Sequence, residues 1–234
     1  MPRHLISDLW HILPLSLRGK LWQVVETAYQ RGNRVIDALF DLGYGIETSL
    51  VAKYKPGDWI GGKFRDSKAN IPTPVVWLVR LRTFLCPTHE DVFMDVGCGT
   101  GRAVFVFARS YARRSRGIEL HDVAYDYCIR NARSFRFDKS KIEFINEDAC
   151  SVEIRDETII LIANPFGINT LRSVMQNIEH SLKSNPRTLR LCYYNPREHR
   201  QYIESVPWLR ALHELKGFKN TIVIYEAMGF GKSG

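Results

Sequence analysis

Residues 92–102 read Val-Phe-Met-Asp-Val-Gly-Cys-Gly-Thr-Gly-Arg, and this stretch decides the fold. An apolar run ends at an acid, Asp95, and glycine then occupies every second position. Residues 103–108, Ala-Val-Phe-Val-Phe-Ala, continue well as a helix. The pattern therefore predicts a strand, a tight glycine turn and a helix. A backbone without Cβ atoms can adopt positive φ and approach a ligand closely, and the helix offers that ligand free N–H groups.

The spacing of these glycines argues against a dinucleotide site. The dinucleotide-binding fingerprint is Gly-x-Gly-x-x-Gly, whereas residues 95–101 read Asp-x-Gly-x-Gly-x-Gly. An acid at the carboxyl end of the strand would point into the ligand crevice, where it repels a pyrophosphate but attracts a cation such as an ammonium. A purely structural turn between a strand and a helix is the alternative interpretation.

This stretch resembles motif I of the class I S-adenosylmethionine-dependent methyltransferases, whose ligand has an α-amino group and a sulfonium but no phosphate. The resemblance implies an α/β, Rossmann-like, seven-stranded methyltransferase sheet with an antiparallel last strand, here with an N-terminal helical extension. It also implies S-adenosyl-L-methionine as the cofactor. The motif residues that would bind it are Asp95, Gly97, Cys98, Gly99 and Gly101.

The rest of the chain after motif I alternates between strand-like and helix-like segments. Strands are expected at 115–120, 142–145, 158–163 and 188–194, and helices near 101–113, 122–135, 169–183 and 198–205. Two last strand-like runs, 209–216 and 221–226, are joined by a Gly-Phe-Lys-Asn turn. A terminal hairpin after five βα repeats is how the methyltransferase sheet ends.

Two of the expected strand ends carry acids in the order that the family shows. Glu119 ends the second strand, and the resemblance implies that it accepts both ribose hydroxyls, with Leu120 beside it. Asp148 follows the third strand, and the resemblance implies a hydrogen bond from the adenine amine, with Ala149 beside it. By sequence alone, Glu119 would equally serve a nicotinamide cofactor, and Asp148 would be an ordinary turn or cap residue.

The fourth expected strand ends in Asn164-Pro165-Phe166, which resembles the Asn/Asp-Pro-Pro-aromatic signature of amino-methylating enzymes. The resemblance implies that oxygens of this turn accept protons from the amine and that the aromatic ring holds the acceptor. These three residues are therefore the candidate catalytic residues, and Asn164 would also contact the cofactor. The second proline of the signature is missing, because Phe166 follows Pro165 directly. A plain turn after a strand is the alternative.

Residues 1–70 form an N-terminal extension that precedes an expected methyltransferase domain at 71–234. Apolar residues at helical spacing predict basic, amphipathic helices over 1–42, interrupted at Pro14 and broken near Gly32-Asn33. Such a helix can pack on its own domain, act as a lid or make peripheral contact with a membrane through residues 1–40. Residues 43–70 are rich in glycine, lysine and aspartate and are expected to form a loop.

The segment Ile71-Pro72-Thr73-Pro74 is expected to lead into a helix that begins near Pro74 and ends before Pro87. It resembles the entry segment of the non-SET protein lysine methyltransferases. That resemblance implies that Thr73 belongs to a loop covering the cofactor.

The bulk composition bounds the class of protein. Hydrophobic residues make up 45% and charged residues 25%, as in soluble globular proteins. Five scattered cysteines without a C-x-x-C pair indicate a reducing, cytoplasmic compartment, and the histidine spacing predicts no metal site. No segment approaches the ~18–20 apolar residues of a membrane span. The net charge of +8 fits nucleic acid, an anionic membrane, an acidic substrate or simply a basic surface.

The sequence therefore predicts an S-adenosylmethionine-dependent methyltransferase that N-methylates a protein or a small-molecule amine by direct in-line transfer. Two alternatives stay open. One is a nucleic-acid methyltransferase, which the net charge favours; the other is a non-catalytic, cofactor-binding module that regulates a partner. The identity of the acceptor has no signature in the sequence, because acceptor pockets are built by loops and extensions.

Overall fold

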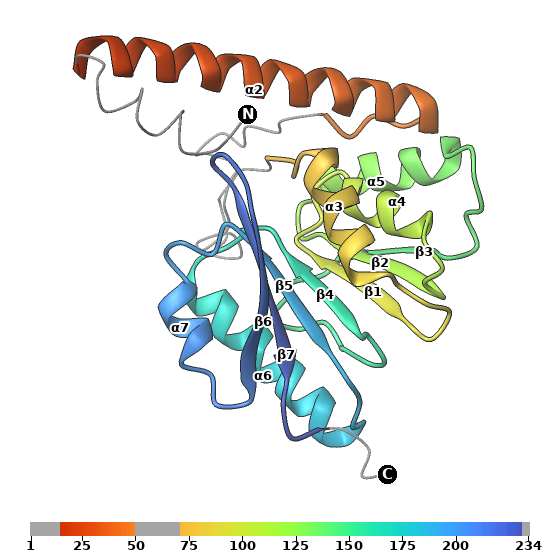
Figure 1. The fold of residues 1–234 in the computed structure, drawn as a ribbon. Coiled ribbons are helices and arrows are strands. Elements are labelled where there is room, and N and C mark those ends of the chain that lie inside the picture. Colours follow the sequence, from red (N-terminus) through yellow and green to blue (C-terminus); the bar gives the residue numbers. More distant parts are fainter. Residues whose placement is uncertain (1–14, 50–70, 231–234) are drawn as a thin grey trace.

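A computed structural model describes residues 15–49 and 71–230 of the 234-residue chain. The centre is a seven-stranded sheet with the order β3-β2-β1-β4-β5-β7-β6 (Figure 1). The strands are β1 Val92–Val96, β2 Arg114–Ile118, β3 Ile142–Ile145, β4 Ile159–Ile162, β5 Arg190–Tyr194, β6 Leu209–Lys216 and β7 Thr221–Ala227. Strands β1 to β5 pair in parallel, and β7 runs antiparallel to both β5 and β6. The predicted fold class and terminal hairpin are confirmed.

Helices cover both faces of this sheet. The described helices are α2 Leu15–Tyr44, α3 Val75–Leu85, α4 Arg102–Ala108, α5 Asp122–Ser134, α6 Ile168–Ser184 and α7 Arg200–Glu204. Helices α6 and α7 lie on one face and α3, α4 and α5 on the other, while α2 crosses one end of the molecule (Figure 1). Among the described helices, none has the length and apolarity needed to cross a membrane.

The core consists of two apolar layers, one on each face of the sheet. Successive β1 side chains point to opposite faces. Met94 and Val96 pack into the layer under α6, whereas Phe93 stacks on Phe107 of α4 with 3.7 Å between ring centroids. All five residues of β1 are buried, as expected of a central parallel strand that is covered on both sides.

The strand order reverses between β1 and β4. Strands β1 and β4 are neighbours, but the chain continues from β1 to β2 on one side and from β4 to β5 on the other. The segments that follow these two strands therefore lead in opposite directions across the sheet. In open α/β sheets, ligands bind in the crevice at this reversal, outside the carboxyl ends of the strands. The fold thus places the glycine turn and the Asn164 turn at one edge of the sheet.

Helix α2 is longer than the sequence predicts. The expected break at Gly32-Asn33 is wrong, because α2 runs unbroken from Leu15 to Tyr44. A Cβ at Gly32 would meet nothing within 4 Å, so this glycine keeps helical backbone at only its small entropic cost. The predicted interruption at Pro14 and most of the predicted 43–70 loop lie outside the described residues.

Candidate functional site

The turn after β1 has the backbone conformation that motif I predicts. Gly97, Gly99 and Gly101 adopt φ of 77°, 56° and 88°, the left-handed region that favours glycine. The amides of Gly97 and Cys98 both donate to the Ile118 carbonyl at 2.9 Å. The turn is therefore anchored to the end of β2, and its glycines are required by conformation.

The turns after β1 and β4 lie in direct contact. A Cβ built on Gly97 would lie 2.3 Å from Pro165 Cβ, so only glycine allows this approach. Asn164, the preceding residue, has φ of 59°. Asparagine tolerates this left-handed conformation better than most residues. Two predicted site segments, 67 residues apart along the chain at Gly97 and Asn164, are thus brought together.

Asp95 is the most unusual group at this edge. Its side chain is buried, and its Oδ1 has no hydrogen-bond partner among the described residues. Burial, followed by the negative charge of Glu119, raises the pKa of Asp95 to about 8. An unpartnered buried carboxyl is costly unless a donor or a cation completes it. The site therefore fits a ligand that brings an ammonium to Asp95.

Glu119 lies at the end of β2 and holds the glycine turn. Its Oε2 accepts the Gly99 amide at 2.8 Å and its Oε1 accepts the His121 amide at 2.9 Å. Burial raises the pKa of Glu119, although these backbone hydrogen bonds oppose the shift. The carbonyls of Glu119 and Leu120 both accept from Asn146 Nδ2, which fixes the segment after β2.

Asp148 begins a turn after β3, the strand beside β2. Its Oδ1 accepts the Cys150 amide at 2.8 Å, and its carbonyl accepts the Ser151 amide at 2.8 Å. Ala149 is partly buried against the core. Asp148 therefore has the turn role that its sequence context suggested, and hydrogen bonding to an adenine amine stays a prediction.

Cys98 and Phe166 both direct their side chains into packed surroundings. Cys98 is buried, its Sγ lies 3.9 Å from Cys128 Sγ, and burial raises the pKa of its thiol. Phe166 is only 5% exposed and belongs to the apolar layer that contains Leu171. The ring of Phe166 is therefore committed to core contacts in this structure, which does not fit the predicted role of holding an acceptor.

A buried arginine next to the glycine turn was not predicted. Arg102, the first residue of α4, is 4% exposed and forms an ion pair with Asp37 of α2 at 2.8 Å. Its guanidinium also donates to Thr48 Oγ1 at 2.7 Å, to Ser49 Oγ at 2.9 Å and to the Thr73 carbonyl at 3.3 Å. These five residues are called the Arg102 cluster below.

Further hydrogen bonds connect the cluster to its surroundings. Asp41 of α2 accepts the amide and hydroxyl of Thr48, at 2.8 Å and 2.6 Å. The Thr48 carbonyl accepts the Thr100 hydroxyl at 3.0 Å. Asn131 of α5 donates to the carbonyls of Glu47 and Thr100. Residues 46–49 are therefore fastened at once to α2, to α5 and to the glycine turn.

The sequence contains two features that indicate this cluster, but hydrophobic periodicity alone does not show that they belong together. Asp37 and Asp41 are four residues apart, so they share one face of α2. Arg102 directly follows the last glycine of motif I. Their pairing depends on the fold, because the two carboxylates and the guanidinium come from segments about sixty residues apart along the chain.

Residues 93–185, which contain both turns of the site, match the family model described as a methyltransferase domain. This part of the chain is a methyltransferase domain, and its sheet has the fold of the class I S-adenosylmethionine-dependent methyltransferases. The matched segment of this methyltransferase runs from β1 to the end of α6 and includes Asp95, Glu119, Asp148 and Asn164. No match to the chain was found among curated proteins.

Solved structures share the fold of this methyltransferase at low sequence identity. An RNA methyltransferase from Salinibacter ruber in complex with S-adenosyl-L-homocysteine is 17% identical, with 70% of this chain and 98% of that chain covered and a TM-score of 0.53. A ribosomal protein L11 methylase from Lactobacillus delbrueckii subsp. bulgaricus is 10% identical, with 65% and 78% covered and a TM-score of 0.52. Precorrin 8w decarboxylase from Methanobacterium thermoautotrophicum is 17% identical, with 68% and 93% covered and a TM-score of 0.50. Their names refer to three kinds of substrate, so this likeness shows the fold and selects no acceptor.

Proposed function

We propose that this methyltransferase N-methylates a protein or a small-molecule amine, with residues 71–234 as the methyltransferase domain and residues 1–70 as an extension that covers the site. When bound, S-adenosylmethionine supplies an electrophilic methyl group on a sulfonium. The chain's own task is to hold the cofactor, align an amine with the methyl group and exclude water. The observation that carries the cofactor part of the proposal is the buried carboxyl of Asp95, whose Oδ1 lacks a partner among the described residues.

The residues at the sheet edge fit the chemical groups of this cofactor. Asp95 would pair with its ammonium, Glu119 would accept the ribose hydroxyls, and Asp148 would accept the adenine amine. The glycine turn allows close backbone approach, because its three left-handed glycines carry no Cβ. The remaining contacts proposed are Thr73, Cys98, Leu120, Ala149 and Asn164.

The acceptor side of the proposal rests on the turn after β4. Pro165, which directly follows Asn164, lies against the glycine turn, and the oxygens of such a turn can accept hydrogen bonds from an amine. Phe166 is left out of this role because its ring packs in the core. The five cysteines are all free thiols, which supports our inference of a reducing, cytoplasmic location.

Binding of S-adenosylmethionine to Asp95 should release a proton. The folded carboxyl, with its pKa of about 8, is protonated at neutral pH, and a nearby ammonium favours the charged form. Affinity should therefore rise with pH between about 5 and 8, by up to about tenfold per pH unit. Asp95→Asn should bind roughly 10- to 100-fold more weakly at pH 8 and release no proton, as measured by calorimetry in two buffers of different ionisation enthalpy.

5′-Methylthioadenosine, which has no amino-acid moiety, is the matched control ligand. Wild type and Asp95→Asn should bind it with equal affinity and without a pH slope over the same range. The assignment of Asp95 to the ammonium would be wrong if both proteins released the same number of protons on binding S-adenosylmethionine.

The acceptor is tested by replacing Asn164 without straining the turn. Asn164→Gly removes the side chain and keeps the positive φ, so the turnover number should fall roughly 10- to 1,000-fold, and cofactor affinity should fall much less because Asn164 is only one of several proposed cofactor contacts. The measurement is S-adenosylhomocysteine formation with a panel of small amines, lysine-containing peptides and RNA. Asn164→Asp, which tolerates the same backbone, should retain part of the activity.

Each result of this screen has a defined meaning. If RNA were the only acceptor to be methylated, the protein would be a nucleic-acid methyltransferase and the amine proposal would be wrong. The net charge of +8 is also compatible with that function. Equal turnover by wild type and Asn164→Gly would make Asn164 a structural turn residue. If the protein bound the cofactor but methylated none of the three classes of acceptor, a non-catalytic, cofactor-binding regulatory module would be favoured.

A further inference from the structure

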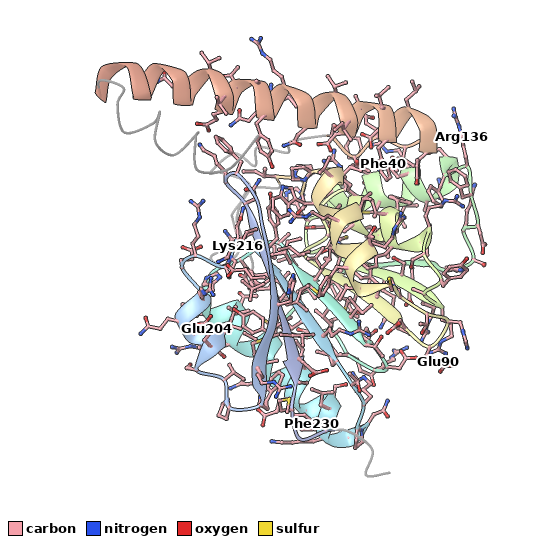
Figure 2. All side chains as sticks on the ribbon, in the orientation of Figure 1. Phe40, Glu90, Arg136, Glu204, Lys216 and Phe230 are labelled. Carbon is pink, nitrogen blue, oxygen red and sulfur yellow. The ribbon has the colours of Figure 1, made fainter. Side chains whose placement is uncertain are left out.

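The outward face of α2 is apolar, which is the reverse of an ordinary surface helix. Val24 is 65%, Val35 59%, Leu39 62% and Leu42 69% exposed, and their spacing places them in one stripe along the helix. Side chains project from this side of α2 away from the body, whereas Phe40 lies on the inner side (Figure 2). An exposed apolar stripe of this length marks an interaction surface.

The inner face of α2 holds the polar groups. The described side chains of α2, residues 23–44, include three acids. Asp37 pairs with Arg102, Asp41 accepts from residues 48 and 49, and Glu26 forms an ion pair with Lys219 of the β6–β7 turn. All three carboxylates are therefore committed to the body of the protein.

The charges left on the outer side are cationic. Arg31 precedes Val35 by one turn and follows Val24 by two turns, which places it within the apolar stripe. Arg34 is one turn before Ala38, at the edge of the stripe, and both arginines are exposed. With no acid between residues 23 and 44 facing outward, this surface combines aliphatic side chains with positive charge only.

The apolar surface extends beyond α2. An apolar groove between α2 and α3 is lined by Ile36, Val76, Val79 and Phe84. Ile71, which lies in the segment before α3, is 73% exposed. The groove adds exposed apolar side chains on the side of α2 that faces α3.

We propose that the outer face of α2 docks on an anionic membrane surface. A long helix with an apolar stripe and flanking cations can lie in the plane of the interface, its aliphatic side chains at the acyl boundary and its arginines among anionic headgroups. A second copy of the chain fits less well. A two-fold helix pair would bring each Arg31 against an apolar stripe with no outward acid to pair with it.

Docking in this way would place the candidate site next to the lipid. Asp37, on the face of α2 opposite the stripe, contacts Arg102 directly after the glycine turn. The two faces of a helix are about 10 Å apart. Helix α2, which contacts the residue after motif I, would therefore also hold the site near the membrane surface. Docking itself does not require a bound cofactor.

The test is sedimentation of the full chain with lipid vesicles, without cofactor. Wild type should bind phosphatidylcholine vesicles containing about a third phosphatidylglycerol, bind pure phosphatidylcholine vesicles far more weakly, and lose affinity as salt is raised. Arg31→Glu/Arg34→Glu should weaken binding to the anionic vesicles at least about tenfold. Val35→Ser and Leu39→Ser should each weaken it roughly three- to tenfold.

Val123→Ser is the matched control, because Val123 is an exposed helical valine that belongs to α5 and not to the stripe on α2. It should bind like wild type, and thermal unfolding should show that every variant is folded, since all five substituted positions are exposed. The proposal is overturned if the wild type does not bind anionic vesicles, or if Val35→Ser and Arg31→Glu/Arg34→Glu bind these vesicles as tightly as Val123→Ser. It is also overturned if light scattering shows a dimer that Leu39→Ser converts to monomer, which would assign the stripe to a second copy.

Discussion

Replacing Arg102 by alanine is expected to lower the free energy of unfolding by about 3–5 kcal/mol. The guanidinium is 4% exposed and serves Asp37, two hydroxyls and the Thr73 carbonyl at once. Alanine would leave the Asp37 carboxylate buried without its cation, and removal of one partner from a buried pair costs far more than the pair contributes on balance. Urea unfolding followed by circular dichroism measures the loss.

Two further substitutions make this expectation specific. Lys183→Ala removes an exposed i,i+4 partner of Glu179 and should change the free energy of unfolding by less than about 0.5 kcal/mol. Arg102→Lys keeps the charge but loses the planar fork that reaches several acceptors, so its loss should be intermediate. An Arg102→Ala variant as stable as Lys183→Ala would mean that the cluster does not hold α2 in place.

Gly97→Ala is expected to destabilise the fold by roughly 2–4 kcal/mol and to abolish measurable cofactor binding. The new Cβ would have to share space with Pro165, at 2.3 Å from its Cβ and 2.7 Å from its Cγ. Neither atom belongs to the far end of a flexible side chain, so the turn after β1 or the turn after β4 must move. The measurements are urea unfolding and calorimetric titration with S-adenosylhomocysteine.

Gly229→Ala is a control that measures the cost of backbone strain without the contact with Pro165. Gly229 has φ of 85°, close to the 77° of Gly97, yet a Cβ there would meet nothing within 4 Å. Gly229→Ala should therefore cost only the backbone part, about 1–2 kcal/mol, and should leave cofactor binding unchanged. If the two variants were equally destabilised, the contact between Gly97 and Pro165 would contribute nothing.

Local sequence patterns were sufficient to predict the scaffold of the site. The turn after β1 needs positive φ at three alternating positions, so its glycines could be recognised without any distant contact. The strands that end near Asp95, Glu119 and Asn164 were placed within two residues, because apolar runs bounded by polar turns mark buried parallel strands. The terminal hairpin was predicted from two strand-like runs joined by a short turn, together with the resemblance to the methyltransferase family, whose sheet ends in an antiparallel strand.

Features that depend on distant partners could not be predicted in the same way. Phe166 was placed in the correct turn, but its burial is determined by packing against the layer that contains Leu171. The helical periodicity of α2 was recognised, yet periodicity does not say which face turns inward. That choice follows from Arg102, which lies 65 residues beyond Asp37 and supplies the positive charge for the acidic face.

The Arg102 cluster also bears on the order in which the protein takes shape during synthesis. Helix α2 is made before the sheet, but the arginine that neutralises its inner face is added 65 residues after Asp37. At about 5–20 residues per second, this delay is roughly 3–13 s. During that interval the acidic face of α2 has no buried partner, whereas its aliphatic stripe is already complete. Helix α2 can therefore find its final position only after β1 and the start of α4 have been made.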